Sequence, residues 1–491
     1  MTIVSTMRDR LGYSVSIFMG AARHQDLIRK DFPAATLLHQ SDLVREAFHS
    51  PAMPRECFSV MADYWASDDF ARERPLMLDE WNRYAGVQFA RKIDREPVVM
   101  GIQARIADAL LTKRPDFILF SETPHNVTRL PILFLARWLK IPVLFFQPTS
   151  PIAPALLPRT SLDTFVAGFQ GSLQPGRDNA LVKASNFAHE TAVTFLNRLE
   201  REGETLMQRE KRAESRQIPQ SRQATAGIGR KVMVSPWTRF SREKKTTQEL
   251  WDSIMQRFRS ELVHKYQNLP DDVDDKSFAL FAMHHQPERT SVPEGPEFAQ
   301  FQGDLIARAR QFLPDHITLV VKEHESQVSP SNTGERGRSS RLYDLVNAFP
   351  NTKLINGSRS SRDQMSRSVC TFTITGSIGI ESALHGVPCV YFGRPWWSGM
   401  PNTYFFRTDS TWEEFEETAI QSPDQVKDFL ISRIREDAVP GFGTPGQKRF
   451  WSRHLDIPSD FEEGFALSVV RMVELFVQRH AAETRDVRNP E

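Results

Sequence analysis

The chain has 491 residues, of which 40% are hydrophobic and 10% aromatic, and its 62 Lys and Arg residues balance 61 Asp and Glu residues. This length is about three times that of an average domain, so we expect two large domains rather than one core. The near-zero net charge argues against bulk nucleic-acid binding. The 3 cysteines fit neither a disulfide framework nor a metal motif, because Cys57, Cys370 and Cys389 lie far apart.

No segment has the character of a membrane span or a signal peptide. The most apolar stretch, Leu130 to Phe146, contains Arg137 and Lys140 and is interrupted by Pro142. Residues 11–22 are too polar for the apolar core of a signal peptide. We therefore predict a cytoplasmic protein, and peripheral association with the inner face of the membrane stays open.

Residues 1–172 alternate short apolar runs with helical patterns. The runs at 14–19, 117–120 and 143–146 are typical of buried strands, and 130–139 has helical periodicity. Strand, helix and strand in succession indicate a parallel sheet. We expect these residues to form one α/β domain.

The rest of the chain predicts a connecting region and a second α/β domain. Residues 173–270 are charged, and we expect a helix, a mobile loop to Gly229 and a further helix at 247–266. A second alternating series fills 271–435, and a loop and helices fill 436–491. Within that series we expect a helix at 297–312 and strands at 278–282, 317–322, 353–355, 369–375 and 389–392.

The segment from Thr375 to Pro388 carries the strongest local pattern: a strand, a glycine loop, one short helix and a second strand. Gly376 and Gly379 would let the backbone approach a ligand, and amides at the helix start favour a phosphate. Ser377 adds a hydroxyl donor, and Glu381 could accept hydrogen bonds from ribose hydroxyls. The alternative is that the glycines merely make a tight turn.

Polar side chains also follow two other predicted strands of the second domain. Lys322 and His324 end one strand, where His324 could donate an N–H to a donor phosphate. Gln286 and Glu288 follow the strand at 278–282. A structural role for His324 is the alternative, and the nearby histidines lack a clear set of three or four zinc ligands, so we expect no metal.

In the first domain, Glu122 and His125 follow the strand at 117–120. Either could act as general base, and Glu122 could also act as nucleophile. The alternative is that Glu122 caps the next helix. Two further patterns are interpreted as loops: the GxGxxG match at 441–446, which lacks a preceding strand, and the DxD match at 272–274, which follows a proline.

Together these blocks, scattered from Pro115 to Trp397, resemble the capsule-polysaccharide synthesis family, which includes Kdo transferases. The resemblance implies a GT-B fold, meaning two Rossmann-like domains with a cleft between them. It also implies a CMP-linked sugar donor, a polysaccharide or glycolipid acceptor and no cofactor. The His-Pro pair and Ser loop that bind phosphate in related transferases correspond to His324 and Ser377, although Glu325 replaces the proline.

The reaction itself stays open at this point. A glycosyltransferase fits the motifs best, with Glu122, His125 and Glu288 as candidate catalytic residues. A nucleotide-sugar epimerase or hydrolase, or a non-catalytic nucleotide-sugar-binding protein, fits the same fold, because fold does not determine reaction.

Overall fold

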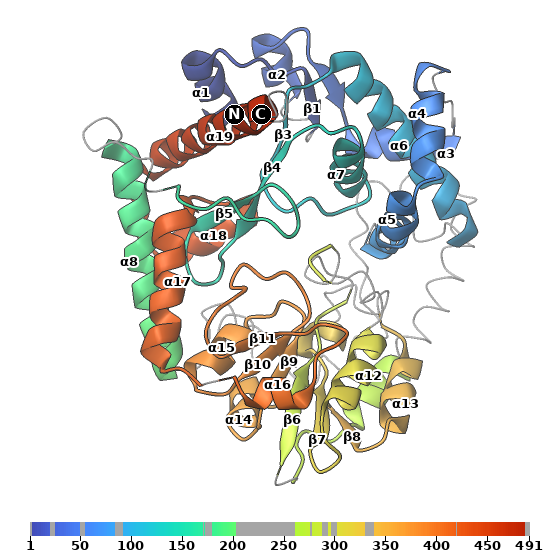
Figure 1. The fold of residues 1–491 in the computed structure, drawn as a ribbon, viewed down its shortest axis with the longest axis vertical. Coiled ribbons are helices and arrows are strands. Elements are labelled where there is room, and N and C mark those ends of the chain that lie inside the picture. The colour runs from blue at the N-terminus through green and yellow to red at the C-terminus, as the bar shows by residue number, and fades with distance from the viewer. Residues whose placement is uncertain are drawn as a thin grey trace, which may run out of the picture.

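The computed structural model describes residues 2–19, 25–49, 55–83, 92–169, 171, 179–202, 261–274, 277–286, 293–295, 302–328, 338–418 and 420–486. Figure 1 shows two α/β halves stacked along the long axis, with both termini in the half drawn at the top. No helix in these ranges is long and apolar enough to cross a bilayer.

The N-terminal half is built on a small mixed sheet. β3 (Ile118–Phe120) pairs in parallel with β4 (Val143–Pro148), and β5 (Ala155–Arg159) pairs antiparallel with β4. The turn between β4 and β5 is too short for a crossover, so an antiparallel pair is the only choice. The other elements of this half are α1 (Thr2–Leu11), β1 (Ile17–Met19), α2 (Gln25–Asp31), β2 (Thr36–Leu38), α3 (Gln40–His49), α4 (Arg55–Trp65), α5 (Asp68–Asp79), α6 (Lys92–Lys113) and α7 (Arg129–Trp138).

The C-terminal half contains a six-stranded sheet in the order β11-β10-β9-β6-β7-β8, in which every neighbouring pair is parallel. Counted from β6, this is the order of the doubly wound dinucleotide-binding fold, and the order reverses between β6 and β9. The strands are β6 (Phe278–Ala282), β7 (Thr318–Lys322), β8 (Thr352–Ile355), β9 (Thr371–Thr373), β10 (Cys389–Tyr391) and β11 (Thr403–Phe405), and the helices are α12 (Gln302–Phe312), α13 (Ser340–Ala348), α14 (Ser361–Met365), α15 (Ile378–Leu384) and α16 (Trp412–Glu416).

The C-terminal segment returns to the N-terminal half. α17 (Pro423–Asp437) packs beside α8 (Asn179–Glu202) along one flank of the molecule (Figure 1). β12 (Val439–Pro440) then extends the N-terminal sheet beside β5, and α18 (Pro445–His454) and α19 (Phe461–Asp486) follow. A buried apolar cluster that includes Leu157 of β5, Leu430 of α17 and Trp397 joins the two halves.

The predicted fold class is confirmed: two α/β halves, each with its own sheet. The expected strands of the C-terminal sheet are all present, although β9 is shorter than 369–375. The N-terminal sheet differs from the expectation, because β1 pairs with β2 outside it and only β3 and β4 are parallel. The predicted helix at 247–266 is described only over 261–267, where it is helical, and the predicted loop to Gly229 lies outside the described residues.

Candidate functional site

The candidate site lies at the carboxyl edge of the six-stranded sheet, where the strand order reverses. In doubly wound folds the crevice between the two reversing strands holds the ligand. Here β6 continues into His284 and Gln286, and β9 continues into the loop from Thr375 to Ser377. The sheet therefore brings together two of the segments predicted to bind the donor.

The ring of His284, which follows β6, contacts the end of β9 and the loop after it. Its Nε2 lies 3.0 Å from Thr373 Oγ1 and accepts the backbone N–H groups of Ile374 and Thr375 at 3.3 and 3.4 Å. Burial, together with the charge of Arg338, lowers the pKa of His284 to about 4. The ring is therefore neutral at physiological pH and serves as an acceptor that shapes the loop.

Packing requires glycine at Gly376 in the loop and at Gly379 in the first turn of α15. A Cβ on Gly376 would come within 2.7 Å of Thr373 Oγ1, and one on Gly379 would meet the ring of Trp397 at 2.4 Å. The space beside these two residues is thus filled by the protein's own side chains. Packing against Thr373 and Trp397 is thus enough to require glycine at both positions, and close approach of a ligand stays a prediction.

Ser377 precedes α15 and makes a hydrogen bond within its own turn. Its hydroxyl donates to Glu381 Oε1 at 2.8 Å, and Glu381 is 2% exposed. The amides of Gly379 and Ile380 donate to the carbonyls of Gly376 and Ser377. The Ser377 hydroxyl would have to turn away from Glu381 to contact a ligand.

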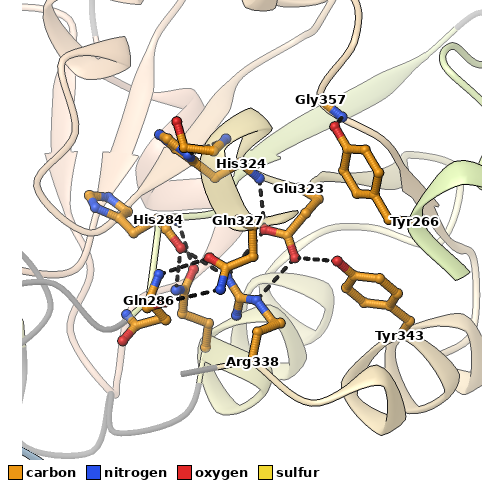
Figure 2. Close-up of polar contacts among 11 residues, drawn as sticks. Tyr266, His284, Gln286, Glu323, His324, Gln327, Arg338, Tyr343 and Gly357 are labelled. Carbon is orange, nitrogen blue, oxygen red and sulfur yellow. Dashed lines mark hydrogen bonds and ion pairs between the residues drawn. The ribbon is translucent and has the colours of Figure 1, made fainter. Parts of the chain in front are cut away.

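A buried ionic network supports the neighbouring strand end (Figure 2). Glu323 accepts the backbone N–H of His324 at 2.7 Å and the hydroxyl of Tyr343 at 2.8 Å, and it pairs with Arg338 at 3.0 Å. Arg338 also donates to the carbonyl of His284 at 2.9 Å. The network connects the ends of β6 and β7, so the positions of His284 and His324 depend on the same buried charges.

Two glutamine side chains hold the segment after β6. Gln302 of α12 bonds both the N–H and the carbonyl of His284, at 2.8 and 2.9 Å. Gln327 does the same for Gln286, at 2.9 and 3.0 Å. Each amide replaces a missing strand partner and satisfies buried backbone groups. The backbone of this segment is therefore fixed before any ligand arrives.

His324 and Lys322 are placed differently by the same strand. Nδ1 of His324 accepts the N–H of Ser326 at 3.2 Å, so a neutral ring carries its proton on Nε2. The buried ammonium of Lys322 donates to Arg359 O at 2.6 Å and to Ser361 Oγ at 2.9 Å. In that tautomer Nε2 of His324 is a donor, whereas Lys322 secures the loop before α14.

Of the candidate catalytic residues, Glu288 lies outside the described residues. Glu122 pairs with Arg129 at 2.8 Å, and Nδ1 of His125 donates to the carbonyl of Thr123 at 2.8 Å. The N-cap of the helix that follows is Thr128, and Oδ1 of Asn126 accepts the N–H of Arg129 at 2.9 Å. Glu122 therefore contacts the first turn of α7 as an ion pair and not as its cap.

A small pocket, here called the junction pocket, lies between the two halves next to this site. Its volume is ≈ 80 Å³. A larger cavity of ≈ 1010 Å³ lies elsewhere, between α5, α7 and the segment 160–166, and no predicted site residue lines it. Size alone would favour that cavity, but the switch point and the converging polar groups favour the junction pocket. The junction pocket is lined by Gln147, Pro148, Ser150, Pro151, Glu294, Thr375, Ser377, Ile380, Pro395, Trp396 and Trp397.

The two patterns interpreted as loops have structural partners. Asp272 of the DxD match pairs with Arg359 at 2.9 Å and with Arg367. The GxGxxG match does follow a strand, the two-residue β12, but Thr444 and Gln447 form a capping box at the start of α18. Within the described residues, no group of three or more His, Cys, Asp or Glu side chains is arranged to hold a metal ion.

No family model matches the sequence, and a search of curated proteins gives no match. Among solved structures it is similar to KpsC, a beta Kdo 2,7 transferase of Thermosulfurimonas dismutans, with 17% identity and a TM-score of 0.22 over 36% of this chain. The match covers 51% of that transferase, about half its length. The UDP-GlcNAc 2-epimerase of Methanocaldococcus jannaschii matches at 14% identity and a TM-score of 0.21, over 73% of this chain and 81% of that one. The UDP-GlcNAc 2-epimerase of Neisseria meningitidis, bound to UDP-GlcNAc, matches at 12% identity and a TM-score of 0.20, over 97% of this chain and 95% of that one. At these TM-scores the likenesses do not decide between sugar transfer and epimerisation.

Proposed function

We propose that the protein is a glycosyltransferase that takes a sugar from a nucleotide donor bound to residues 271–435. The observation that carries the proposal is the switch point between β6 and β9, which ends in the polar segments at His284 and Ser377 and adjoins a pocket shared with the N-terminal half. A ligand in this crevice would contact both halves, as transfer between a donor and an acceptor requires.

The donor phosphate would bind the Ser377 hydroxyl, turned away from Glu381, the adjacent backbone N–H groups and the imidazole of His324. The buried network of Glu323 and Arg338 helps to fix the position of His324, because Glu323 accepts its backbone N–H. Preorganised donors of this kind stabilise the charge that develops on a departing nucleotide. The resemblance favours a CMP-linked sugar, such as Kdo or a similar acidic sugar.

The acceptor, a surface polysaccharide or glycolipid, would bind the N-terminal half, residues 1–172. Glu122 is our first choice for the base or nucleophile, with His125 and Glu288 as further candidates. Glu122 follows β3 at the carboxyl edge of its sheet, and Arg129 orients its carboxylate. We propose that transfer needs no divalent ion, with His324 and the loop amides supplying the charge stabilisation instead.

Binding measurements test the donor site. A thermal-shift screen of CMP, UDP, GDP and their sugars should raise the apparent stability for one nucleotide class, because a ligand specific to the native state stabilises it. In calorimetry, Ser377→Ala and His324→Ala should each lower the affinity for that nucleotide by about tenfold, the scale of one hydrogen bond to a charged group. Unchanged affinity in both variants would remove the phosphate site.

Turnover measurements test the reaction. Incubation of the protein with donor alone should leave the donor intact, and addition of acceptor should release nucleotide. An altered sugar without acceptor would identify an epimerase, and an intact donor in every mixture would identify a binding protein. Loss of transfer in EDTA that added metal restores would contradict metal independence.

A further inference from the structure

The junction pocket contains a buried carboxylate with an oxygen that has no hydrogen-bond partner among the described residues. Glu294 lines this pocket, is 4% exposed, and its Oε1 has no hydrogen-bond partner among the described residues. Burying an ionisable group without a partner costs several kcal/mol. A side chain that carries this cost is expected to have a partner in another state of the protein.

The backbone around Glu294 is held firmly although its side chain is not. The carbonyl of Glu294 accepts the N–H of Arg394 at 2.8 Å, and that of Gly295 accepts Nη1 of Arg394 at 2.9 Å. Arg394 in turn accepts hydrogen bonds on its carbonyl from Gln147 of β4 at 3.3 Å and from Arg159 of β5 at 3.2 Å. The carboxylate is therefore presented from a segment that is tied to both halves.

Arg159, whose charge interacts with that of Glu294, makes its hydrogen bonds to other groups. Arg159 directs its Nη1 to Gln147 Oε1 at 2.8 Å and lies 3.9 Å from the ring centre of Phe165. Burial lowers the pKa of Arg159 to about 10, and the charge of Glu294 acts in the opposite direction. The two side chains thus interact through space without forming an ion pair, so the acceptor capacity of Glu294 is left for a ligand.

The other groups in the pocket indicate what kind of ligand this is. Ser150 Oγ also lacks a hydrogen-bond partner among the described residues, and the rings of Trp396 and Trp397 form an apolar wall. A carboxylate repels phosphate and carboxylate groups but accepts hydrogen bonds from hydroxyl groups. Aromatic rings pack well against the C–H face of a sugar ring. A volume of ≈ 80 Å³ has room for part of a sugar and not for a whole nucleotide.

We propose that Glu294 binds hydroxyl groups of the donor sugar, with Ser150 as a second contact, and so selects the sugar that enters the junction pocket. This inference rests on the proposed function, because it places the sugar beside the phosphate site at Ser377. It assigns Glu294 to recognition and not to the chemical step. An acidic group on the sugar would point away from this pocket.

Calorimetry with two ligand pairs tests the assignment: UDP with UDP-N-acetylglucosamine, and CMP with CMP-N-acetylneuraminate. For the pair that binds the wild type, Glu294→Gln and Glu294→Ala should each lower the affinity for the nucleotide sugar by about tenfold, the scale of a hydrogen bond to a charged group. The affinity for the bare nucleotide should stay within about twofold of the wild-type value. Glu416→Gln, an exposed carboxylate on α16, is the matched control and should change neither.

The outcomes separate the two proposals. A wild type that binds neither pair overturns the donor site and this inference with it. Variants that keep the full wild-type preference for the nucleotide sugar overturn the role of Glu294 alone. Thermal unfolding of the free protein gives a second readout, because Glu294→Gln should leave Tm unchanged or raise it if the carboxylate has no internal partner. A Tm several degrees lower would show a structural role and overturn the inference.

Discussion

The guanidinium of Arg338 lies 3.0 Å from the carboxylate of Glu323 (Nε to Oε2), and the two side chains are 2% and 0% exposed. A pair buried this deeply differs from a surface ion pair, because removal of one charge leaves the other without compensation. Glu323 also accepts the N–H of His324, and Arg338 donates to the carbonyl of His284. The stability of the fold and the geometry of the site therefore depend on the same ion pair.

Glu323→Gln should therefore lower the free energy of unfolding by about 3–5 kcal/mol, the usual cost of breaking a buried pair. Urea denaturation measures this. Asp409→Asn is the control, since Asp409 pairs with Arg407 at 3.3 Å while 79% exposed, and exposed pairs contribute about 1 kcal/mol or less. Equal losses in the two variants would contradict the supporting role of the network.

The neutral state of His284 predicts a pH dependence of stability. Its pKa is 6.5 when unfolded and about 4 when folded, so the unfolded chain binds the proton more tightly. The stability associated with His284 is therefore complete above pH 6.5 and falls toward pH 4, by up to about 1.4 kcal/mol per pH unit. His284→Gln should lack this slope when denaturation is repeated across that range. A slope that survives in the variant would assign the titration to another group.

Glu73 should act in the opposite direction over nearly the same range. Burial raises its pKa from 4.5 to about 7, while Tyr64, whose hydroxyl donates to Oε2 at 2.6 Å, and Arg137 partly oppose the shift. Its contribution is complete below pH 4.5 and is lost as the pH rises to 7. We therefore expect the free energy of unfolding of Glu73→Gln to change more steeply with pH on the acid side than that of the wild type, because Glu73 no longer offsets the contribution of His284. An unchanged profile would show that Glu73 does not titrate there.

Gly379 should tolerate no larger side chain while Trp397 is present. A Cβ at this position would lie 2.4 Å from the indole ring, and overpacking of a buried site typically costs about 1–3 kcal/mol. Gly379→Ala should lose this amount in urea denaturation, and Trp397→Leu should recover part of it in a double-mutant cycle. Simple additivity of the two changes would mean that the ring does not set the limit.

Much of the fold follows from local sequence patterns. The continuous apolar runs at β4 and β6 predict buried strands, and the polar residues at the ends of β6 and β7 predict the sheet edge that carries the site. The antiparallel β5 could not be predicted, because Leu156 and Leu157 form a very short apolar run between prolines. The pairing of β12 with β5 joins residues 439–440 to 155–156, and no local signal encodes such a distant contact.

The site was predicted less completely than the fold, because its contacts also join residues that are distant in the sequence. Gln302, Gln327 and Arg338 are single polar residues in helices or loops, and only the tertiary structure brings them to the backbone of the site. Glu294 likewise stands in a short segment with no strand or helix pattern. What could have been anticipated is Glu323: side chains alternate along a strand, so it should face away from Lys322.

The last prediction concerns Glu122, whose carboxylate is 12% exposed and pairs with Arg129 at 2.8 Å. If Glu122 is the base or nucleophile, Glu122→Gln keeps the size of the side chain but removes its reactive charge. Turnover should then fall on the order of a hundredfold or more, the usual scale for general acid–base catalysis, while the donor Kd stays the same. Arg129→Met is the informative companion, because it breaks the same ion pair and leaves the carboxylate in place. If Glu122 only anchors the first turn of α7, both variants should lose the same stability and keep wild-type turnover per folded molecule. That result would move the search for the reacting group to His125 and Glu288.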